Sequence, residues 1–277
     1  MRLTNVALAL RAAALLGGIA FPAFGQQRQT EPPFKWSGRI APGRWIRVYD
    51  LNGRISVGAA SGDNVEVTAT KQWRRGDPAT VRFETKKFGP GDESVVICAM
   101  WDDRGTCDER GYESHRRDRG DRGDRGMHDN DVSVEFHVLV PKGVKVGVNT
   151  VNGAVTVDGA TSDVDASTVN GEVDVTTGGG RVNASNVNGG VRARLARVES
   201  DGTMDFTTVN GTVTVEVPAD FGGDLEVQTV NGSLNTNFEL TVSGRMDPHH
   251  LRGHVGRPGG PRLRLETVNG NVELRRR

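Results

Sequence analysis

Apolar and polar residues alternate along most of this 277-residue chain, and short turns interrupt the alternation at regular intervals. Before Asn170 the apolar positions are Val164 and Ala166, and after it they are Val173 and Val175. A period of two places alternate side chains on one face of a β-strand. Enrichment in valine and threonine also favours strand over helix. The pattern predicts short strands, each with one buried face.

The turns between these strands share the tripeptide Val-Asn-Gly, which occurs six times. Asparagine and glycine tolerate the backbone angles of tight bends. Successive copies lie 18, 18, 22, 21 and 38 residues apart, and such a period is typical of a solenoid. A related tripeptide contains Asn52 after a leucine. The six asparagines are Asn152, Asn170, Asn188, Asn210, Asn231 and Asn269.

Two all-β architectures fit this local pattern. Asn-Gly between alternating runs is typical of a β-hairpin with a type I′ turn, and serial hairpins would form a meander or a sandwich. Their apolar face needs a cover, and the sequence shows no amphipathic helix to provide one. Coils that wind back on themselves bury that face unaided. We therefore predict a β-solenoid with coils of 18–22 residues, in which each asparagine stacks about 4.8 Å from the next.

The segment between Asn52 and Asn152 lacks the tripeptide. Its 100 residues leave room for about five coils at this period. A separate N-terminal β-sandwich is the alternative. Phe34, Trp36 and Trp45 precede the first coil, and we expect them to cover the end of the solenoid.

The N-terminal residues differ from the rest of the chain. Residues 1–25 combine Arg2, an apolar run and a small-residue site at 23–25, which predicts a cleaved secretory signal peptide. The alternative is a retained anchor helix, for which the run is short. Residues 26–33 are predicted to be a linker.

Residues 34–277 are predicted to form the solenoid domain, with two insertions. Residues 102–126 hold 15 charged residues of 25, so we expect this segment to be mobile. Residues 244–261 are rich in Gly, Pro, Arg and His. No later stretch is apolar enough to predict a membrane span once the signal peptide is removed.

Composition limits the classes of function that this chain can have. The 35 basic and 35 acidic residues give zero net charge, which provides no long-range attraction to nucleic acid. The two cysteines, Cys98 and Cys107, are nine positions apart and are predicted to form a disulfide in an oxidising compartment. Two free thiols are the alternative.

Few residues are candidates for chemistry. Asp247, His249, His250 and His254 lie within eight positions and have the side chains of a zinc, copper or nickel site, although a Gly/Pro-rich loop orients ligands poorly. No motif predicts a cofactor, and no pair of carboxylates is placed for acid and base catalysis. The outward positions after each corner are predicted to form one column: Thr156, Asp174, Arg192, Thr214, Asn235 and Glu273.

The repeats resemble those of a bacterial family of putative adhesins, a group with a domain of unknown function and T-V-N-G repeats. The complete tetrapeptide occurs at 150–153, 168–171, 208–211, 229–232 and 267–270, and residues 186–189 begin with Asn instead. The segments 140–146 and 34–38 are also similar to the family. The resemblance implies an exported β-solenoid and provides no catalytic or binding residue.

These observations predict a non-catalytic module that is periplasmic, secreted or at the cell surface. Its expected partner is an envelope or extracellular protein, or a glycan, because repeat surfaces suit extended ligands. The alternatives are a carbohydrate-active lyase or hydrolase on the same scaffold, and a signalling accessory of the envelope.

Overall fold

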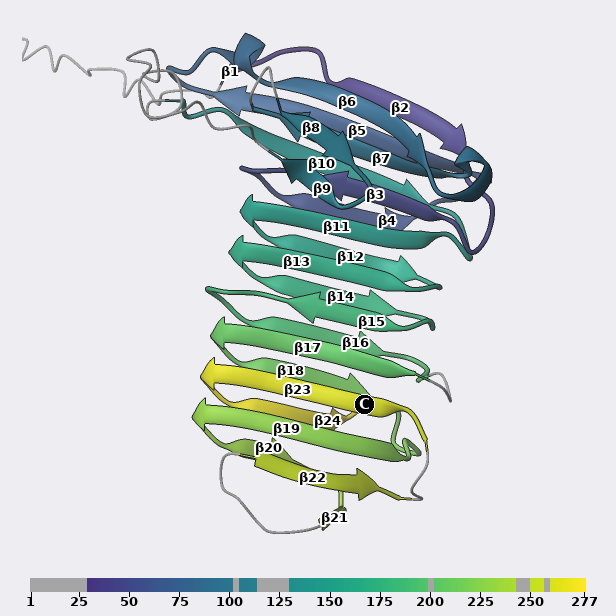
Figure 1. Cartoon of the computed structure of the whole chain (residues 1–277), viewed down its shortest axis with the longest axis vertical. Helices are drawn as coiled ribbons and strands as arrows, with labels where there is room; N and C mark the ends of the chain where they lie inside the picture. Colours follow the sequence, from purple (N-terminus) through teal and green to yellow (C-terminus); the bar gives the residue numbers. More distant parts are fainter. Residues whose placement is uncertain (1–28, 102–104, 114–129, 199–201, 243–249, 257–259) are drawn as a thin grey trace, which may run out of the picture.

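The computed structural model describes residues 29–101, 105–113, 130–198, 202–242, 250–256 and 260–277. Two eleven-stranded sheets face each other in one elongated body (Figure 1). Within the described ranges the helical segments are two short 3₁₀ turns, η1 (Pro78–Thr80) and η2 (Pro90–Asp92). No helix in this part of the chain has the length and apolar character needed to cross a membrane. The predicted all-β class is confirmed.

Sheet 1 has the order β1-β5-β10-β4-β12-β14-β16-β18-β24-β20, with β2 paired to β5. Its strands are β1 (Gln29–Thr30), β2 (Phe34–Arg39), β4 (Ile55–Ala59), β5 (Asn64–Trp73), β10 (Ser133–Val140), β12 (Val155–Ala160), β14 (Val173–Thr177), β16 (Val191–Leu195), β18 (Val213–Val217), β20 (Leu234–Thr236) and β24 (Val272–Arg276).

Sheet 2 has the order β21-β22-β19-β23-β17-β15-β13-β11-β3-β7-β6. Its strands are β3 (Trp45–Tyr49), β6 (Arg82–Phe88), β7 (Ser94–Met100), β11 (Lys145–Asn152), β13 (Val164–Asn170), β15 (Val182–Ser185), β17 (Thr203–Asn210), β19 (Gly223–Asn231), β21 (Leu240–Val242), β22 (His250–Val255) and β23 (Arg262–Asn269). A separate hairpin consists of β8 (Thr106–Asp108) and β9 (Gly111–Glu113).

Each repeat forms one coil of a solenoid. A strand of sheet 2 ends at a Val-Asn-Gly corner, and the chain returns as a strand of sheet 1. β11 pairs in parallel with β13 and β3, whereas β12 pairs with β14 and β4. The strands on either side of a corner therefore lie in different sheets, which rules out the hairpin meander and confirms the solenoid.

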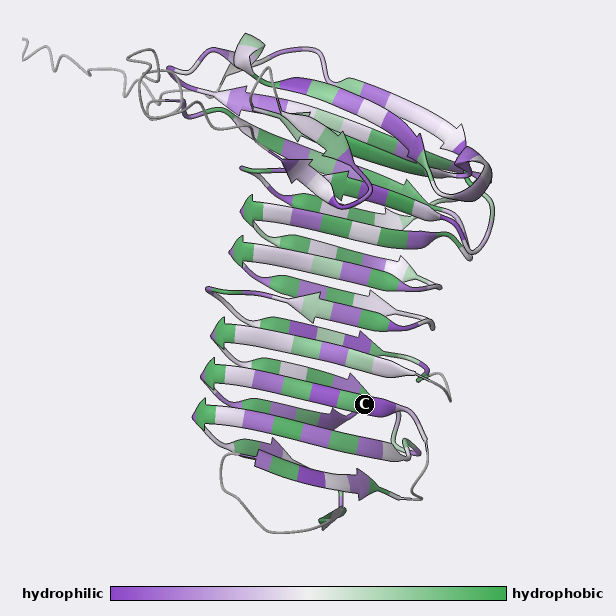
Figure 2. Ribbon diagram, viewed as in Figure 1, coloured by the Kyte–Doolittle hydropathy of each residue, from purple (hydrophilic) through white to green (hydrophobic). Residues whose placement is uncertain are grey.

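The core lies between the two sheets. Alternate positions of the coil strands point inward, and Figure 2 shows the resulting change from hydrophobic to hydrophilic along the ribbons. Parallel pairing without a register shift places Val146 beside Val164, and Val164 beside Val182. Identical side chains thus stack from coil to coil, and all three valines are fully buried.

The corner asparagines form a hydrogen-bonded ladder along one edge of the body. Five side-chain amides donate to the side-chain oxygen of the asparagine in an adjacent coil, over 2.8–2.9 Å, and Asn152 accepts the first of these bonds. At the N-terminal end, the Asn52 amide instead donates to the carbonyl oxygen of Val132 at 2.7 Å. In spatial order the ladder contains Asn152, Asn170, Asn188, Asn210, Asn269 and Asn231.

A second ladder lies inside the corners, two residues before each asparagine. There a threonine hydroxyl, or the Asn186 amide, donates to the carbonyl oxygen of a corner glycine in the adjacent coil over 2.7–3.1 Å. These side chains are buried, so each polar group needs a protein partner. The donors are Thr150, Thr168, Asn186, Thr208, Thr267 and Thr229.

Asp50 occupies the inner-threonine position of the first coil. Its side chain is buried, and Oδ1 accepts the Leu51 N–H at 2.8 Å. Burial raises the pKa of Asp50 to about 7, although the backbone N–H groups of Leu51 and Asn52 and the side chain of Trp101 oppose this shift. A titratable carboxyl therefore replaces a neutral hydroxyl where the solenoid meets the N-terminal strands.

The corner glycines allow neighbouring coils to approach closely. A Cβ atom on Gly171 would lie 2.1 Å from the carbonyl oxygen of Gly153 in the adjacent coil. The obstacle is backbone, which has no rotamer that would relieve the clash. The contact explains why glycine follows the asparagine in each repeat.

The last two coils do not stack in sequence order. β23 lies between β17 and β19, and β24 lies between β18 and β20. The expectation that consecutive repeats are spatial neighbours is wrong here. The chain skips one strand position after β18, forms β19 and β20, and later returns to fill the gap. The 38 residues between Asn231 and Asn269 provide the length for this path.

One coil, and not five, precedes the Val-Asn-Gly repeats. β3 and β4 form it, in register with β11 and β12. Beyond this coil, β10 pairs in parallel with β4, and β7 pairs in parallel with β3. The outer N-terminal strands then extend both sheets through antiparallel pairs: β5 with β10, β2 and β1, and β6 with β7. The corner tripeptide is absent from this segment, and its outer strands do not repeat the coil.

Three segments expected to lack structure contribute strands. The β8–β9 hairpin lies within residues 102–126, so the expected mobility is wrong for 105–113. β22 lies within 244–261 and pairs with β19 and β21. β1 lies within the predicted linker 26–33 and pairs with β5. Buried Cys107 and Val255 show the physical reason: each insertion carries apolar side chains that cover an otherwise open part of a sheet. The predicted signal peptide lies outside the described residues.

Candidate functional site

The outer face of β3 carries an aromatic and basic side-chain set. Trp45, Arg47 and Tyr49 point outward because Ile46 and Val48 fill the core. β3 is paired on both sides, by β11 and β7. The expectation that Trp45 covers the end of the solenoid is therefore wrong, since it lies on the face of sheet 2.

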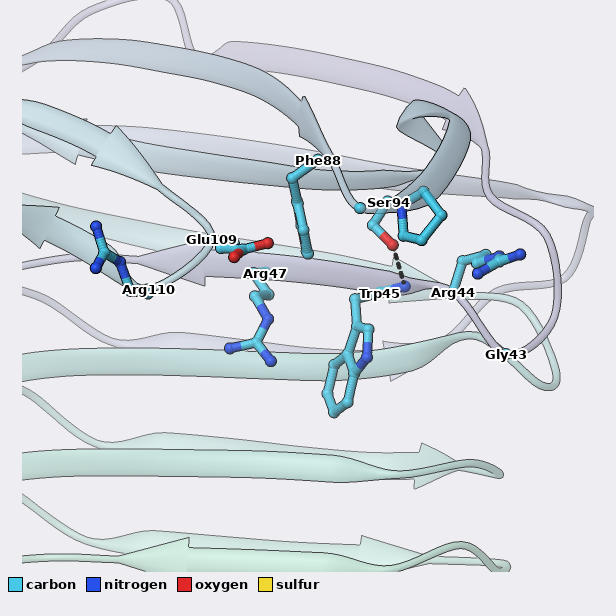
Figure 3. A pocket seen from close by; sticks show the side chains of 10 residues that line it. Gly43, Arg44, Trp45, Arg47, Phe88, Ser94, Glu109 and Arg110 are labelled. Atoms are coloured by element: carbon cyan, nitrogen blue, oxygen red, sulfur yellow. Dashed lines mark hydrogen bonds between the residues drawn. The ribbon is translucent and has the colours of Figure 1, made fainter.

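These side chains line a pocket of about 480 Å³, called here the Trp45 pocket (Figure 3). Its walls come from β3, the η2 turn after β6, the start of β7, and the turn between β8 and β9. Small-molecule sites typically occupy about 300–1,000 Å³, so the pocket has room for a small ligand. The principal lining side chains are Arg44, Trp45, Arg47, Phe88, Glu109 and Arg110.

Arg47 lies between the aromatic walls. Its guanidinium carbon is 4.6 Å from the ring centroid of Trp45 and 6.0 Å from that of Phe88. One terminal nitrogen donates to the Tyr49 hydroxyl at 3.2 Å, and the other lies 3.7 Å from a carboxylate oxygen of Asp165. The buried Nε has no hydrogen-bond partner.

Glycine makes room for this arginine. A Cβ atom on Gly147, the neighbour of Arg47 in β11, would lie 3.0 Å from the arginine Cγ. The side chain can therefore cross β11 toward Asp165 on β13. The sheet face around Arg47 is thus shaped by the one outward position in β11 that lacks a side chain.

Two further arginines stand at the rim and are already paired. Arg44 is 2.5 Å from the Glu93 carboxylate, and Arg110 is 3.1 Å from Asp108. Hydrogen bonds from the backbone N–H and the side chain of Arg110 hold the pKa of Asp108 below its usual value. Because these ion pairs are exposed, each contributes little to the stability of the fold. An anionic ligand can therefore replace the carboxylate partner of either arginine.

A disulfide holds one wall in place. It joins Cys98 of β7 to Cys107 of β8. Both cysteines pack in a small buried cluster with Tyr49 and Tyr112 at its margin. The Tyr49 hydroxyl also donates to the Glu109 carbonyl at 3.0 Å. The hairpin that supplies Glu109 and Arg110 to the pocket is therefore fixed both covalently and by packing.

The histidine cluster is not assembled as a metal site in the described part of the chain. His250 and His254 both lie on β22, four positions apart, which is about 13 Å along a strand. His250 Nε2 is 3.4 Å from Glu226, whose pKa is lowered by Arg252 and His250. Among the described residues no three metal-binding side chains come together. Asp247 and His249 lie outside those residues.

The predicted outward column is present on sheet 1. Thr156, Asp174, Arg192, Thr214, Glu273 and Asn235 are successive register partners. Asp174 pairs with Arg194 at 2.8 Å, and not with Arg192 as its position would suggest. The column therefore forms a mixed polar surface.

The fold and this pocket define an all-β solenoid with a ligand-sized cavity on one outer face. A sequence profile of the family Toastrack DUF4097 matches residues 122–275, more than half of the chain. The chain belongs to this family. The resemblance to an adhesin-like group of unknown function is thereby confirmed at family level.

One solved structure shares the fold of this chain. A "putative cell adhesion protein" from Clostridium sporogenes ATCC 15579 has a TM-score of 0.50 and 10% identity, covering 89% of this chain and 100% of that chain. A "putative adhesin" from Bacteroides fragilis NCTC 9343 has a TM-score of 0.28 and 8% identity, covering 88% and 97%. At these identities the likeness concerns the fold alone, and the second carries no argument. No curated protein matches the chain.

Sequence reasoning did not identify the Trp45 pocket. Trp45, Phe88 and Arg110 are far apart in the chain, and the hairpin that carries Arg110 was assigned to a mobile insertion. The signal that was present is local: Trp45, Arg47 and Tyr49 alternate with the core residues of a strand, so three large side chains share an outer face. Aromatic and arginine side chains together are typical of binding surfaces.

Proposed function

We propose that this protein is an exported, non-catalytic binding module of the cell envelope or surface, with a glycan or protein as its ligand. The observation that carries this proposal is the Trp45 pocket, a ligand-sized cavity with two aromatic walls and three arginines on a solenoid face. The Cys98–Cys107 disulfide and the hydrogen bond from the Tyr49 hydroxyl to the Glu109 carbonyl hold the hairpin wall in place, so this wall needs little ordering when a ligand enters.

Two features support export. The pattern of residues 1–25 is that of a secretory signal peptide. The Cys98–Cys107 disulfide is suited to an oxidising compartment. Cell fractionation of the tagged full chain, with and without residues 2–25, tests this part. We expect the intact chain outside the cytoplasm and the shortened chain inside it; equal distribution would contradict export.

Binding is tested with the purified protein on a panel of polysaccharides and on immobilised envelope extract. We expect retention of a ligand without its conversion. The same polysaccharides are then incubated with the protein and analysed for shortened or unsaturated products. Turnover would replace the binding proposal with a carbohydrate-active enzyme, and failure to bind any glycan or envelope protein would contradict the proposed function.

A further inference from the structure

We propose that the Trp45 pocket binds an acidic saccharide unit, with the ligand carboxylate on Arg47 and the sugar ring against the apolar side chains that line the cavity. This inference rests on the proposed binding function and specifies its ligand class. The cavity volume of about 480 Å³ is within the usual range for a small ligand.

The charge of the lining points to an anion. Three arginines face the cavity and one carboxylate, that of Glu109, lines it. Arg44 and Arg110 have carboxylate partners within 3.1 Å. Arg47 has a neutral partner, the Tyr49 hydroxyl, and only a long contact of 3.7 Å to Asp165. Arg47 is therefore the cation with the most unused hydrogen-bonding capacity toward a ligand.

The surroundings of Arg47 strengthen its attraction for an anion. Its guanidinium lies against the Trp45 ring at 4.6 Å, and its Nε is buried without an acceptor. Apolar surroundings lower the local dielectric and strengthen charge-assisted hydrogen bonds. A planar guanidinium also matches a carboxylate in a bidentate geometry, which a lysine ammonium does not.

The walls favour a sugar ring over a peptide. Trp45, Phe88 and Pro90 present apolar surfaces that suit the C–H faces of a pyranose. Peptides commonly bind by adding a strand to an open sheet edge. The strands beneath the pocket, β3 and β7, are both paired on both sides, so these two strands offer no backbone edge. β6 is the outermost strand of sheet 2, and it contributes to the pocket only through its last residue, Phe88, and the turn that follows. Side chains therefore provide most of the recognition surface, which suits a single ring.

The test uses isothermal titration calorimetry with four probes: a uronic-acid oligosaccharide, its carboxyl-reduced neutral form, a sulfated oligosaccharide and poly-glutamate. We expect binding of the uronic-acid probe and at least tenfold weaker binding of the neutral form. Equal affinity for the neutral form, or tighter binding of poly-glutamate, would overturn the proposal. Preference for the sulfated probe would assign the site to sulfate esters and overturn the carboxylate assignment.

Variants locate the site. Arg47→Gln should weaken the uronic-acid probe at least tenfold, and Arg47→Lys should weaken it less, because the charge remains while the planar fork is lost. Arg192→Gln, on the outer face of sheet 1, is the matched control and should bind as wild type does. Thermal unfolding checks folding, and Trp45→Phe provides a second variant if Arg47→Gln is unstable. Wild-type affinity in both Arg47→Gln and Trp45→Phe would overturn the assignment.

The outcomes separate this inference from the proposed function. If no saccharide binds but an envelope protein is retained, the ligand class is wrong and the binding function stands. If neither binds, both fail.

Discussion

Asp50→Asn should stabilise the protein, and the gain should grow as the pH rises. The buried carboxyl has a pKa of about 7 in place of its ordinary 3.8. Each pH unit between these values corresponds to about 1.4 kcal/mol, so the ionised carboxylate costs the folded state about 4 kcal/mol above pH 7. Asn186, at the same position of another coil, shows that an amide fits: its Oδ1 accepts the following N–H at 2.7 Å.

The direction follows from proton binding. Below pH 3.8 both the folded and the unfolded chain hold the Asp50 proton, so the free energy of unfolding carries no penalty from ionisation of this carboxyl. Between pH 3.8 and about 7 only the folded chain holds it, so stability falls as the pH rises. Above pH 7 neither form holds the proton and the loss is constant. Asparagine does not titrate in this range, so the variant escapes the loss.

The assay is urea unfolding of wild type and variant at pH 5 and pH 8. We expect the free-energy advantage of the variant to increase by about 2.5 kcal/mol between the two pH values. Asp158→Asn, at an exposed position of sheet 1, is the matched control and should show a nearly constant difference. An equal advantage of Asp50→Asn at both pH values would refute the proposed titration of Asp50.

The remaining predictions concern the corners and the hairpin. Gly171→Ala should destabilise the fold by more than about 3 kcal/mol, because its Cβ would meet backbone at 2.1 Å; an unchanged urea midpoint would contradict this packing. Asn188→Ala removes two ladder hydrogen bonds and should cost about 1–2 kcal/mol, whereas Asn231→Ala, which removes one, should cost about half as much; equal losses would argue against an additive ladder. Replacing Cys98 and Cys107 by serine should lower the free energy of unfolding by about 2–3 kcal/mol. Protease should then cleave the β8–β9 hairpin before it cleaves the solenoid. Simultaneous cleavage of the hairpin and the solenoid would show that the disulfide does not act locally.

Local sequence predicted the coil well because the coil is a local unit. The tripeptide, the period near 20 residues and the alternation define two strands and a corner within one repeat. They do not define which repeat stacks on which. Asn231 and Asn269 lie in nearly equivalent sequences, so either coil satisfies the position beside Asn210.

The Trp45 pocket could not be predicted from local sequence for a related reason. Its parts meet only when β3, β7 and the β8–β9 hairpin are assembled, and no single window of sequence contains them. Trp45 and Ser94 are 49 residues apart, yet the Trp45 N–H donates to the Ser94 hydroxyl at 3.2 Å. The abundance of charges in 102–126 predicts a mobile segment, yet the Cys98–Cys107 disulfide attaches that segment to the sheet.

The displaced final coil has a consequence for how the molecule is made. β23 and β24 are synthesised after β19, β20, β21 and β22, yet they lie between β17 and β19 and between β18 and β20. Until β23 and β24 have been synthesised, β17 and β18 each lack one of their two neighbouring strands. An unpaired strand edge can pair with a strand of another copy of the chain. Folding of β23 and β24 into this gap therefore makes the two sheets continuous.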